Sequence, residues 1–405
     1  MEQEIHPSVF GAEALMETYS DNIILFGPDA LAQLGEELFL SDRKTILLVM
    51  GGASARIPLR MILGSPVFRK PGLNMPHHEN VPPEPDTECV RAIVRTMERE
   101  QPDAVLAVGG GSVMDAAKAA YLSWQTGLDI DDLFGVNVAS DRFPERKFQR
   151  ICAMPTTAGT GSEVTPYSNI IDARTGVKKL LMDPVLIPEA AAVIPELTLT
   201  APEKLTRETG FDALVHSIES FLNFKAMAAH PEAEPLAPEA IRLIVPALPA
   251  ALRNPGDSEA RTRLSAAATL AGMAIRTSPT SLPHLLSYSF CGKASHGDAV
   301  AALLPHFWRF YLAEPEVRER TMRLAPFFPG DTPEEVIDSF CTFLRSCGGE
   351  TDPGRLAQTG AEMIDKLAED ALLNPVKLTG APRSVTPENC RAVFHEVLDP
   401  VWMRS

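Results

Sequence analysis

The chain has 405 residues, of which 45% are hydrophobic and 22% charged; this balance excludes an intrinsically disordered protein and predicts two or three globular domains. Its 53 acidic residues outnumber 37 basic ones, and the net charge of -16 disfavours nucleic acid and anionic membranes as partners. The six cysteines form no Cys-x-x-Cys pair, which favours a reducing compartment. The start of the chain lacks the pattern of a secretory signal, and no run of about 18 apolar residues occurs. We therefore expect a cytoplasmic protein without a membrane-spanning helix.

The first half of the chain alternates short apolar runs with helical patterns. Residues 45–50, 104–108 and 151–154 have the composition of buried strands, and residues 89–100 and 113–122 have apolar positions at helical spacing. Strands that alternate with helices predict a parallel sheet covered by helices.

The second half of the chain has a different sequence pattern, because few runs of β-branched residues remain and amphipathic stretches dominate. These stretches cover residues 205–224, 238–252, 259–275, 299–312 and 333–345. Their spacing predicts an all-helical region. We therefore predict an α/β domain over residues 1–195 and a helical domain over residues 196–405.

A glycine-rich turn follows the second predicted strand and opens a helix. It consists of Gly109, Gly110, Gly111 and Ser112. Glycines let backbone N–H groups approach an anion closely, and a helix N-terminus favours negative charge, so the turn suits a pyrophosphate. Met114 occupies the last glycine position of the full Gly-x-Gly-x-x-Gly fingerprint. A tight turn in which Ser112 caps the helix is the alternative interpretation.

A second loop of small and hydroxyl residues follows the third predicted strand. It reads Pro155-Thr-Thr-Ala-Gly-Thr-Gly-Ser-Glu163 and could wrap a ligand, although such residues also make ordinary turns. Loops after parallel strands emerge at one edge of the sheet, where α/β proteins bind ligands. The two loops together therefore favour a nucleotide site.

An acidic residue and three histidines form a candidate metal site in the helical half. Asp212 and His216 are four residues apart, which places them on one face of a helix, and His284 and His296 follow in a second segment. One carboxylate and three imidazoles suit Fe(II), Zn(II), Co(II) or Ni(II). A single histidine is more often structural than a ligand, and spacing does not show that the two segments meet.

The order of these motifs resembles that of the iron-dependent (group III) alcohol dehydrogenases, from about Phe26 to the C-terminus. The motifs are residues 109–118 (Gly-Gly-Gly-Ser-Val-Met-Asp-Ala-Ala-Lys), 155–165, 210–216 (Gly-Phe-Asp-Ala-Leu-Val-His) and 295–297 (Ser-His-Gly). The resemblance implies a dehydroquinate synthase-like architecture: a dinucleotide-binding α/β domain, an all-α domain, and a catalytic metal in the cleft between them. It also implies hydride transfer between a nicotinamide cofactor and a small aldehyde or alcohol.

The resemblance assigns roles residue by residue. The implied ligands of Fe²⁺, Zn²⁺ or another divalent metal are Asp212, His216, His284 and His296. The implied dinucleotide contacts are Gly109, Gly110, Gly111, Ser112, Asp115, Thr156, Thr157, Thr160 and Lys178.

The turn after the first predicted strand bears on the choice of cofactor. NAD-preferring relatives often place an aspartate there, whereas this chain has Gly51, Gly52 and Ser54, followed by Arg56. A hydroxyl and a cation without a carboxylate suit the 2′-phosphate of NADP(H). An ordinary strand-to-helix turn is the alternative, and it would leave NAD(H) usable.

Departures from the family pattern concern the substrate. Many members carry a further histidine where this chain has Tyr288, which could relay a proton, bind the substrate or simply pack. The expected substrate wall is polar and consists of Ile275, Arg276, Thr280, Ser281 and Lys293. It predicts an aldehyde with a polar or anionic end, such as phosphonoacetaldehyde, which relatives reduce. If the two cations are solvated surface charges, a general medium-chain alcohol dehydrogenase is the alternative.

Other interpretations remain open. A lyase-type cyclase or polyol dehydrogenase of the same architecture fits the motifs less well, and a degenerate nucleotide-binding protein would not need all four metal donors. Apolar helical faces such as residues 266–274 are compatible with the core or with a homodimer interface.

Overall fold

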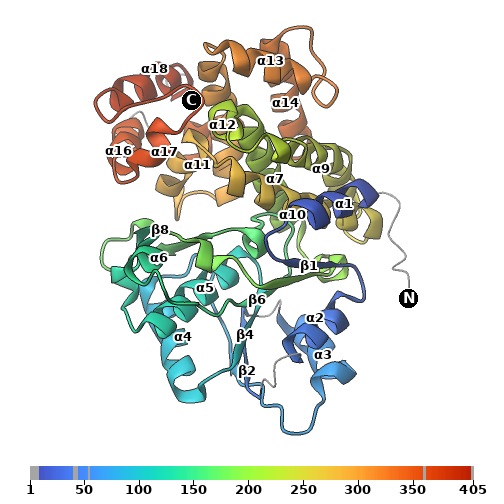
Figure 1. Ribbon diagram of the computed structural model, residues 1–405. Helices are drawn as coiled ribbons and strands as arrows, with labels where there is room; N and C mark the ends of the chain where they lie inside the picture. Colours follow the sequence, from blue (N-terminus) through green and yellow to red (C-terminus); the bar gives the residue numbers. More distant parts are fainter. Residues whose placement is uncertain (1–8, 40–43, 53–54, 359–361, 403–405) are drawn as a thin grey trace. The chain divides into compact units, whose positions relative to one another are not determined.

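A computed structural model describes residues 9–39, 44–52, 55–358 and 362–402 (Figure 1). The chain divides into two compact units, Glu13–Ala201 and Pro202–Ser405, the second of which also takes the residues up to Ala12. The sequence predicted a division after residue 195. The structure divides later because the turn at Pro195–Thr198 contributes Leu197 to the core of the first unit.

The first unit contains a six-stranded sheet in the order β1-β9-β6-β4-β2-β3, and every pairing in it is parallel. The strands are β1 (Ile23–Phe26), β2 (Ile46–Met50), β3 (His77–His78), β4 (Ala104–Gly109), β6 (Cys152–Pro155) and β9 (Ala190–Val193). All residues of β2, β4 and β6 are buried, as continuous apolar runs in a sheet covered on both faces require.

Helices cover both faces of this sheet (Figure 1). Helices α4 (Thr87–Glu100) and α5 (Gly111–Thr126) lie on one face, and α2 (Ala30–Phe39) and α3 (Arg56–Gly64) lie on the other. Alternate residues of β4 contribute to the two resulting cores. The parallel sheet and its covering helices confirm the predicted fold class of the first unit.

A small second sheet, which the sequence patterns did not reveal, has the strand order β5-β8-β7. Strands β7 (Tyr167–Ile171) and β8 (Lys178–Met182) pair antiparallel, and β5 (Gly135–Val136) joins β8 in parallel, near the short helix α6 (Val138–Arg142). These strands are short and only partly buried, so their apolar alternation is weak.

The second unit is helical throughout its described residues, as predicted. Its longer helices are α7 (Glu203–Leu222), α9 (Leu236–Arg253), α10 (Ser258–Thr277), α12 (His296–Tyr311), α14 (Pro333–Ser346) and α18 (Cys390–Trp402). Its shorter helices are α8 (Phe224–Met227), α11 (Leu282–Ser287), α13 (Pro315–Arg323), α15 (Pro353–Ala357), α16 (Glu362–Ala371) and α17 (Pro375–Thr379). Helix α7 packs against α9, α10 and α12, and it is buried continuously from Gly210 to Leu222. Polar side chains in that stretch are therefore core residues.

Among the described helices, the stretch Pro231–Arg253 alone has the length and composition of a membrane span, with a mean hydropathy of 1.3. Half of its apolar window is buried, and α9 within it packs against α7 and α10. Core helices commonly have this composition, so the feature is weak evidence for a membrane segment.

Candidate functional site

The two sequence-predicted loops of the first unit lie against each other. Strands β4 and β6 are neighbours, with Gly109 in register with Pro155, so both loops leave the same edge of the sheet. A Cβ atom on Gly110 would lie 3.1 Å from the hydroxyl of Thr157, and one on Gly111 would lie 2.6 Å from the methyl of Thr160. Gly110 and Gly111 therefore allow the second loop to approach closely, in addition to any role in binding a ligand.

The helix that follows the glycines begins at a residue without a side chain. Gly110 is the N-cap of α5 and makes no side-chain capping bond, so the alternative in which Ser112 caps the helix is not what the structure shows. Instead, the Ser112 hydroxyl accepts a hydrogen bond from the backbone of Glu84 (3.3 Å), and Lys178 forms an ion pair with the Glu84 carboxylate (3.4 Å). This arrangement can bind a phosphate at the start of α5.

Lys118, which the sequence interpretation left without a role, holds the second loop in place. Its buried ammonium donates to the carbonyl oxygens of Ser162 (2.5 Å), Thr165 (2.9 Å) and Tyr167 (3.1 Å) and to the Ser162 hydroxyl (2.9 Å). Burial lowers the pKa of Lys118 to about 8, against the opposing charge of Asp115. The detectable signal was a lysine in an otherwise alanine-rich helix.

Asp115 also forms hydrogen bonds that hold the second loop in place. Its carboxylate accepts from the Ser162 hydroxyl (2.8 Å) and from the backbone N–H of Asn169 (2.9 Å). Burial raises its pKa, and the charge of Lys118 opposes the shift. We call Asp115, Lys118 and Ser162 the loop brace. Asp115 was expected to line the dinucleotide, and in the structure both of its oxygens are engaged by the protein.

The remaining predicted cofactor residues lie at the same sheet edge. Gly51 and Gly52 follow β2, which is the neighbour of β4, and the backbone N–H of the buried Thr156 donates to the Gly109 carbonyl (3.0 Å). Ser54 lies outside the described residues. Arg56 begins α3 and is exposed, so the preference for a 2′-phosphate remains a prediction.

The second unit brings together three of the predicted metal donors, Asp212, His284 and His296, whose ligand atoms lie within 4.8 Å of one another, and it places His216 beside Asp212; the spacing alone could not show this. The Asp212 Oδ1 atom lies 3.5 Å from His216 Nε2, 3.4 Å from His284 Nε2 and 3.4 Å from His296 Nε2. Donors about 2.1 Å from a common tetrahedral metal are about 3.4 Å apart. Helices α7, α11 and α12 supply these residues, which we call the donor cluster.

Hydrogen bonds on the far side of two rings determine which nitrogen carries the lone pair. Glu219 can only accept, so His284 donates its Nδ1–H to that carboxylate. The Ser287 hydroxyl donates to the His284 carbonyl (2.7 Å) and therefore accepts from Nδ1 of His296 (3.1 Å). In the neutral form of each ring, the Nε2 lone pair therefore faces the Asp212 oxygen. One carboxylate oxygen and the Nε2 atoms of neutral imidazoles aimed at one place are donors that fit a divalent metal.

Glu219 is a supporting residue that the sequence interpretation missed. Its second oxygen accepts from the backbone N–H (2.8 Å) and hydroxyl (2.9 Å) of Ser281. Burial would raise the pKa of Glu219, but His284 and Ser281 outweigh that effect and lower it. The signal was available, because Glu219 follows His216 by three residues on the same helical face. Ser281, predicted as a substrate contact, supports the donor cluster instead.

Burial affects the charge of the donor residues, and its uneven extent leaves one side of the donor cluster accessible to solvent. It lowers the pKa of His216 to about 3, so that imidazole is neutral and can offer a lone pair. Burial would raise the pKa of Asp212, but the imidazoles around it, His216 foremost, lower it well below its usual value. The side chains of Asp212, His216 and His284 are 8% exposed or less, whereas that of His296 is 31% exposed. A ligand can therefore reach the cluster on the His296 side.

A glycine brings the last donor to the cluster. A Cβ atom on Gly297 would lie 1.8 Å from the Glu208 carbonyl oxygen of α7. Only glycine allows the start of α12, and with it His296, to approach α7 this closely.

Comparisons with known proteins agree with both units. Residues 21–195 match the family described as iron-containing alcohol dehydrogenase, and residues 206–398 match the C-terminal domain of the Fe-containing alcohol dehydrogenase family. An NADPH-dependent butanol dehydrogenase of Clostridium saccharobutylicum is 31% identical over 387 residues, which span 92% of this chain and 95% of that protein. The chain belongs to the iron-containing alcohol dehydrogenase family. It is thus an oxidoreductase by family, as the sequence motifs predicted.

Solved structures of similar proteins confirm the two-unit fold of this alcohol dehydrogenase. An alcohol dehydrogenase from Oenococcus oeni matches with a TM-score of 0.80 and 26% identity over 93% of this chain and 98% of that chain. A sulfoacetaldehyde reductase from Bifidobacterium kashiwanohense in complex with NAD⁺ matches with a TM-score of 0.78 and 25% identity over 94% of this chain and 97% of that chain. These relatives include an NADPH-dependent enzyme and an NAD⁺ complex, so similarity does not select the cofactor.

The residues predicted to contact the substrate of this alcohol dehydrogenase lie in different surroundings. The centre of the Tyr288 ring lies 6.3 Å from that of the His296 ring. The hydroxyls of Tyr288 and Thr280 both accept from the ammonium of Lys377, so Thr280 lies near Tyr288. Lys293 contacts the sulfur of Met363 (3.2 Å). At the end of α10, Ile275 is buried and Arg276 is partly buried. The sequence analysis did not predict that Lys377 lies near these residues, and nothing in its local sequence indicates this position.

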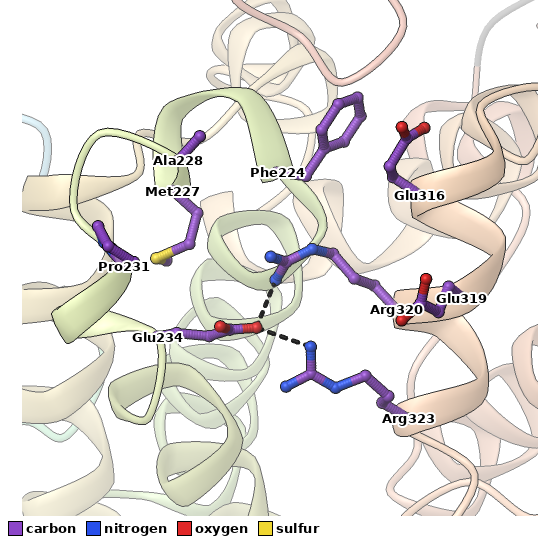
Figure 2. Close-up of a pocket in the computed structure, with 9 residues that line it drawn as sticks. All are labelled: Phe224, Met227, Ala228, Pro231, Glu234, Glu316, Glu319, Arg320 and Arg323. Carbon is purple, nitrogen blue, oxygen red and sulfur yellow. Dashed lines mark hydrogen bonds and ion pairs between the residues drawn. The ribbon is translucent and has the colours of Figure 1, made fainter.

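A separate pocket of about 290 Å³ in the alcohol dehydrogenase's helical unit is shown in Figure 2. Three of its charged residues form ion pairs: Glu234 accepts from Arg320 (3.0 Å) and from Arg323 (2.7 Å). None of its lining residues belongs to the predicted sites. Because its central charges are already paired, this pocket gives no reason to expect a ligand.

Proposed function

We propose that this alcohol dehydrogenase transfers hydride between NAD(P)H and a small aldehyde, with a divalent metal held by the donor cluster. One observation carries the proposal: three imidazole nitrogens lie 3.4–3.5 Å from one carboxylate oxygen, and hydrogen bonds to Glu219 and Ser287 orient two of the rings. A bound divalent cation supplies a Lewis acid that stabilises negative charge on the carbonyl oxygen as hydride arrives from the nicotinamide.

The chain's own residues would orient the reaction and exclude water. Glu219 and Ser287 hold two imidazoles in fixed orientations, so the donor cluster need not rearrange when charge develops. Burial of Asp212, His216 and His284 excludes solvent behind the substrate oxygen, which would enter on the His296 side. We keep Tyr288 as a candidate proton relay, because its ring lies beside that of His296.

For the cofactor, we infer a preference for NADPH, with NADH usable. The glycine turn after β2 has no carboxylate to repel a 2′-phosphate, and the butanol dehydrogenase relative is NADPH-dependent. The loop brace would support the pyrophosphate site by keeping the second loop against the start of α5.

For the substrate, we infer an aldehyde with a polar or anionic end, of which phosphonoacetaldehyde is one example. Polar side chains beside His296 support it, and a similar protein is a sulfoacetaldehyde reductase. A general medium-chain alcohol dehydrogenase is the alternative, since a similar protein is a butanol dehydrogenase.

The decisive experiment is an aldehyde panel assayed with NADPH and NADH on protein loaded with a single defined metal. We expect metal-dependent loss of reduced cofactor and a lower KM for NADPH. Cofactor binding without turnover of any aldehyde, with each of iron, zinc, cobalt and nickel, would show instead a nucleotide-binding protein that has lost catalysis.

A further inference from the structure

An unpredicted lysine lies beside the open side of the donor cluster. Lys377 belongs to α17, and its ammonium donates to the hydroxyls of Thr280 (3.2 Å) and Tyr288 (3.4 Å). The ammonium also lies 5.4 Å from the centre of the Tyr288 ring, which in turn lies nearly parallel to the ring of His296. One aromatic ring therefore separates this cation from the most exposed metal donor.

The charge of Lys377 is not neutralised by the protein. Within the described part of the chain it forms no ion pair, and both of its hydrogen-bond acceptors are uncharged hydroxyls. Asp370, an acidic residue near the end of the preceding helix α16, is engaged by Lys366 (2.8 Å) and by the hydroxyl of Ser289 (2.6 Å). An ammonium has three N–H donors, so Lys377 retains both positive charge and a donor for a ligand.

We propose that Lys377 and Thr280 form a subsite for the sulfonate or phosphonate end of the aldehyde whose carbonyl reaches the donor cluster. The inference rests on the proposed function and names the residues that would select its substrate. The Thr280 hydroxyl accepts from Lys377 and has its own hydrogen to donate, so two donors converge on one place. Charge-assisted hydrogen bonds to a tetrahedral anion are among the stronger polar contacts. A neutral alkyl end would remove the ammonium from water without offering it a hydrogen bond or an opposite charge.

This subsite keeps Thr280 from the substrate wall expected from the sequence, but its cation is Lys377. Lys293 lies against the sulfur of Met363, and Ser281 is engaged by Glu219, so neither occupies the position beside Tyr288. Lys377 provides the positive charge that the sequence interpretation sought, from a helix 97 residues beyond Thr280.

The test compares sulfoacetaldehyde with butanal, a neutral aldehyde of similar length, on metal-loaded enzyme with NADPH. In Lys377→Met we expect the ratio of kcat/KM for sulfoacetaldehyde to that for butanal to fall about 10- to 100-fold, mainly through KM. Lys377→Arg should restore most of the ratio because it keeps the charge. Lys225→Met removes an exposed lysine that likewise donates to an uncharged hydroxyl, that of Ser384 (3.0 Å), and should leave the ratio unchanged.

A binding measurement supplies a second readout. Calorimetric titration of the enzyme with ethanesulfonate should give a dissociation constant about 10-fold or more higher in Lys377→Met than in the parent protein. Equal losses on both aldehydes, unchanged ethanesulfonate binding, or a fall in the ratio in Lys293→Met but not in Lys377→Met would each overturn the subsite. A parent enzyme that reduces neither aldehyde would contradict the proposed function itself, which separates the two failures.

Discussion

Asp115 in the first unit and Asp212 in the second are both central to polar clusters, but their partners differ. Asp115 accepts from a hydroxyl and a backbone N–H and lies near the charge of Lys118, so its hydrogen-bonding capacity is used within the protein. Asp212 is faced by three imidazole nitrogens at 3.4–3.5 Å. The first cluster is complete as it stands, whereas the second aims potential metal-binding nitrogens at one carboxylate oxygen.

This contrast separates polar residues that stabilise a shape from polar residues that bind a ligand. The loop brace holds two loops in contact, and its removal should act mainly on folding. The donor cluster directs imidazole nitrogens at one carboxylate oxygen, as expected where a cation is to bind. Substitutions in the loop brace should therefore lower the free energy of unfolding, whereas substitutions in the donor cluster should lower metal binding and activity.

Replacing the central residue of the donor cluster should have the largest effect. Asp212→Asn removes the negative charge at the centre, and we expect metal content to be lost and kcat/KM to fall on the order of 10³-fold or more. Elemental analysis and aldehyde reduction measure the two effects. Retention of full metal content in Asp212→Asn would contradict the contrast.

The opposite signature is expected for the loop brace. Lys118→Met leaves the carbonyl oxygens of Ser162, Thr165 and Tyr167 without their donor, which should lower the free energy of unfolding by about 3 kcal/mol. Urea denaturation followed by circular dichroism measures this change. Metal affinity should stay the same, and the KM for NADPH should rise. The exposed Lys147→Met is the control, and similar destabilisation in both variants would exclude a special role for Lys118.

A smaller effect is expected behind the donor cluster. Glu219→Gln keeps a similar volume but weakens the hydrogen bond that orients His284, so metal affinity should fall about 10- to 100-fold. Titration of the metal-loaded protein with a competing chelator measures the affinity directly, independently of activity. If Glu219→Gln binds metal as tightly as the parent, the carboxylate is only a core hydrogen-bond acceptor.

The smallest effect is expected in the pocket of Figure 2, whose charges are already paired. Glu234 is 28% exposed, so Glu234→Gln should change the free energy of unfolding by less than about 1 kcal/mol and leave kcat/KM unchanged. Thermal denaturation and the aldehyde assay provide both readouts. A large loss of activity would instead point to a ligand at this pocket.

Much of the fold could be predicted because its signals are local. The apolar runs of β2, β4 and β6 and the helical spacing in α7 are properties of a few adjacent residues. The weakly patterned sheet of β5, β7 and β8 escaped prediction for the same reason. Side-chain roles were harder: Asp115 and Ser281 were expected to contact ligands, and the structure shows them bonded to other protein groups.

By itself, the sequence determined the family, the two-part architecture and the candidate donor and loop residues, because each rests on short motifs whose residue types already carry the chemistry. Only the tertiary structure showed that Asp212, His216, His284 and His296 meet, that Glu219 and Ser287 orient two of the rings, and that Lys377 lies beside Tyr288. These contacts join residues as many as 89 positions apart, and such proximity depends on how the helices pack rather than on any local pattern.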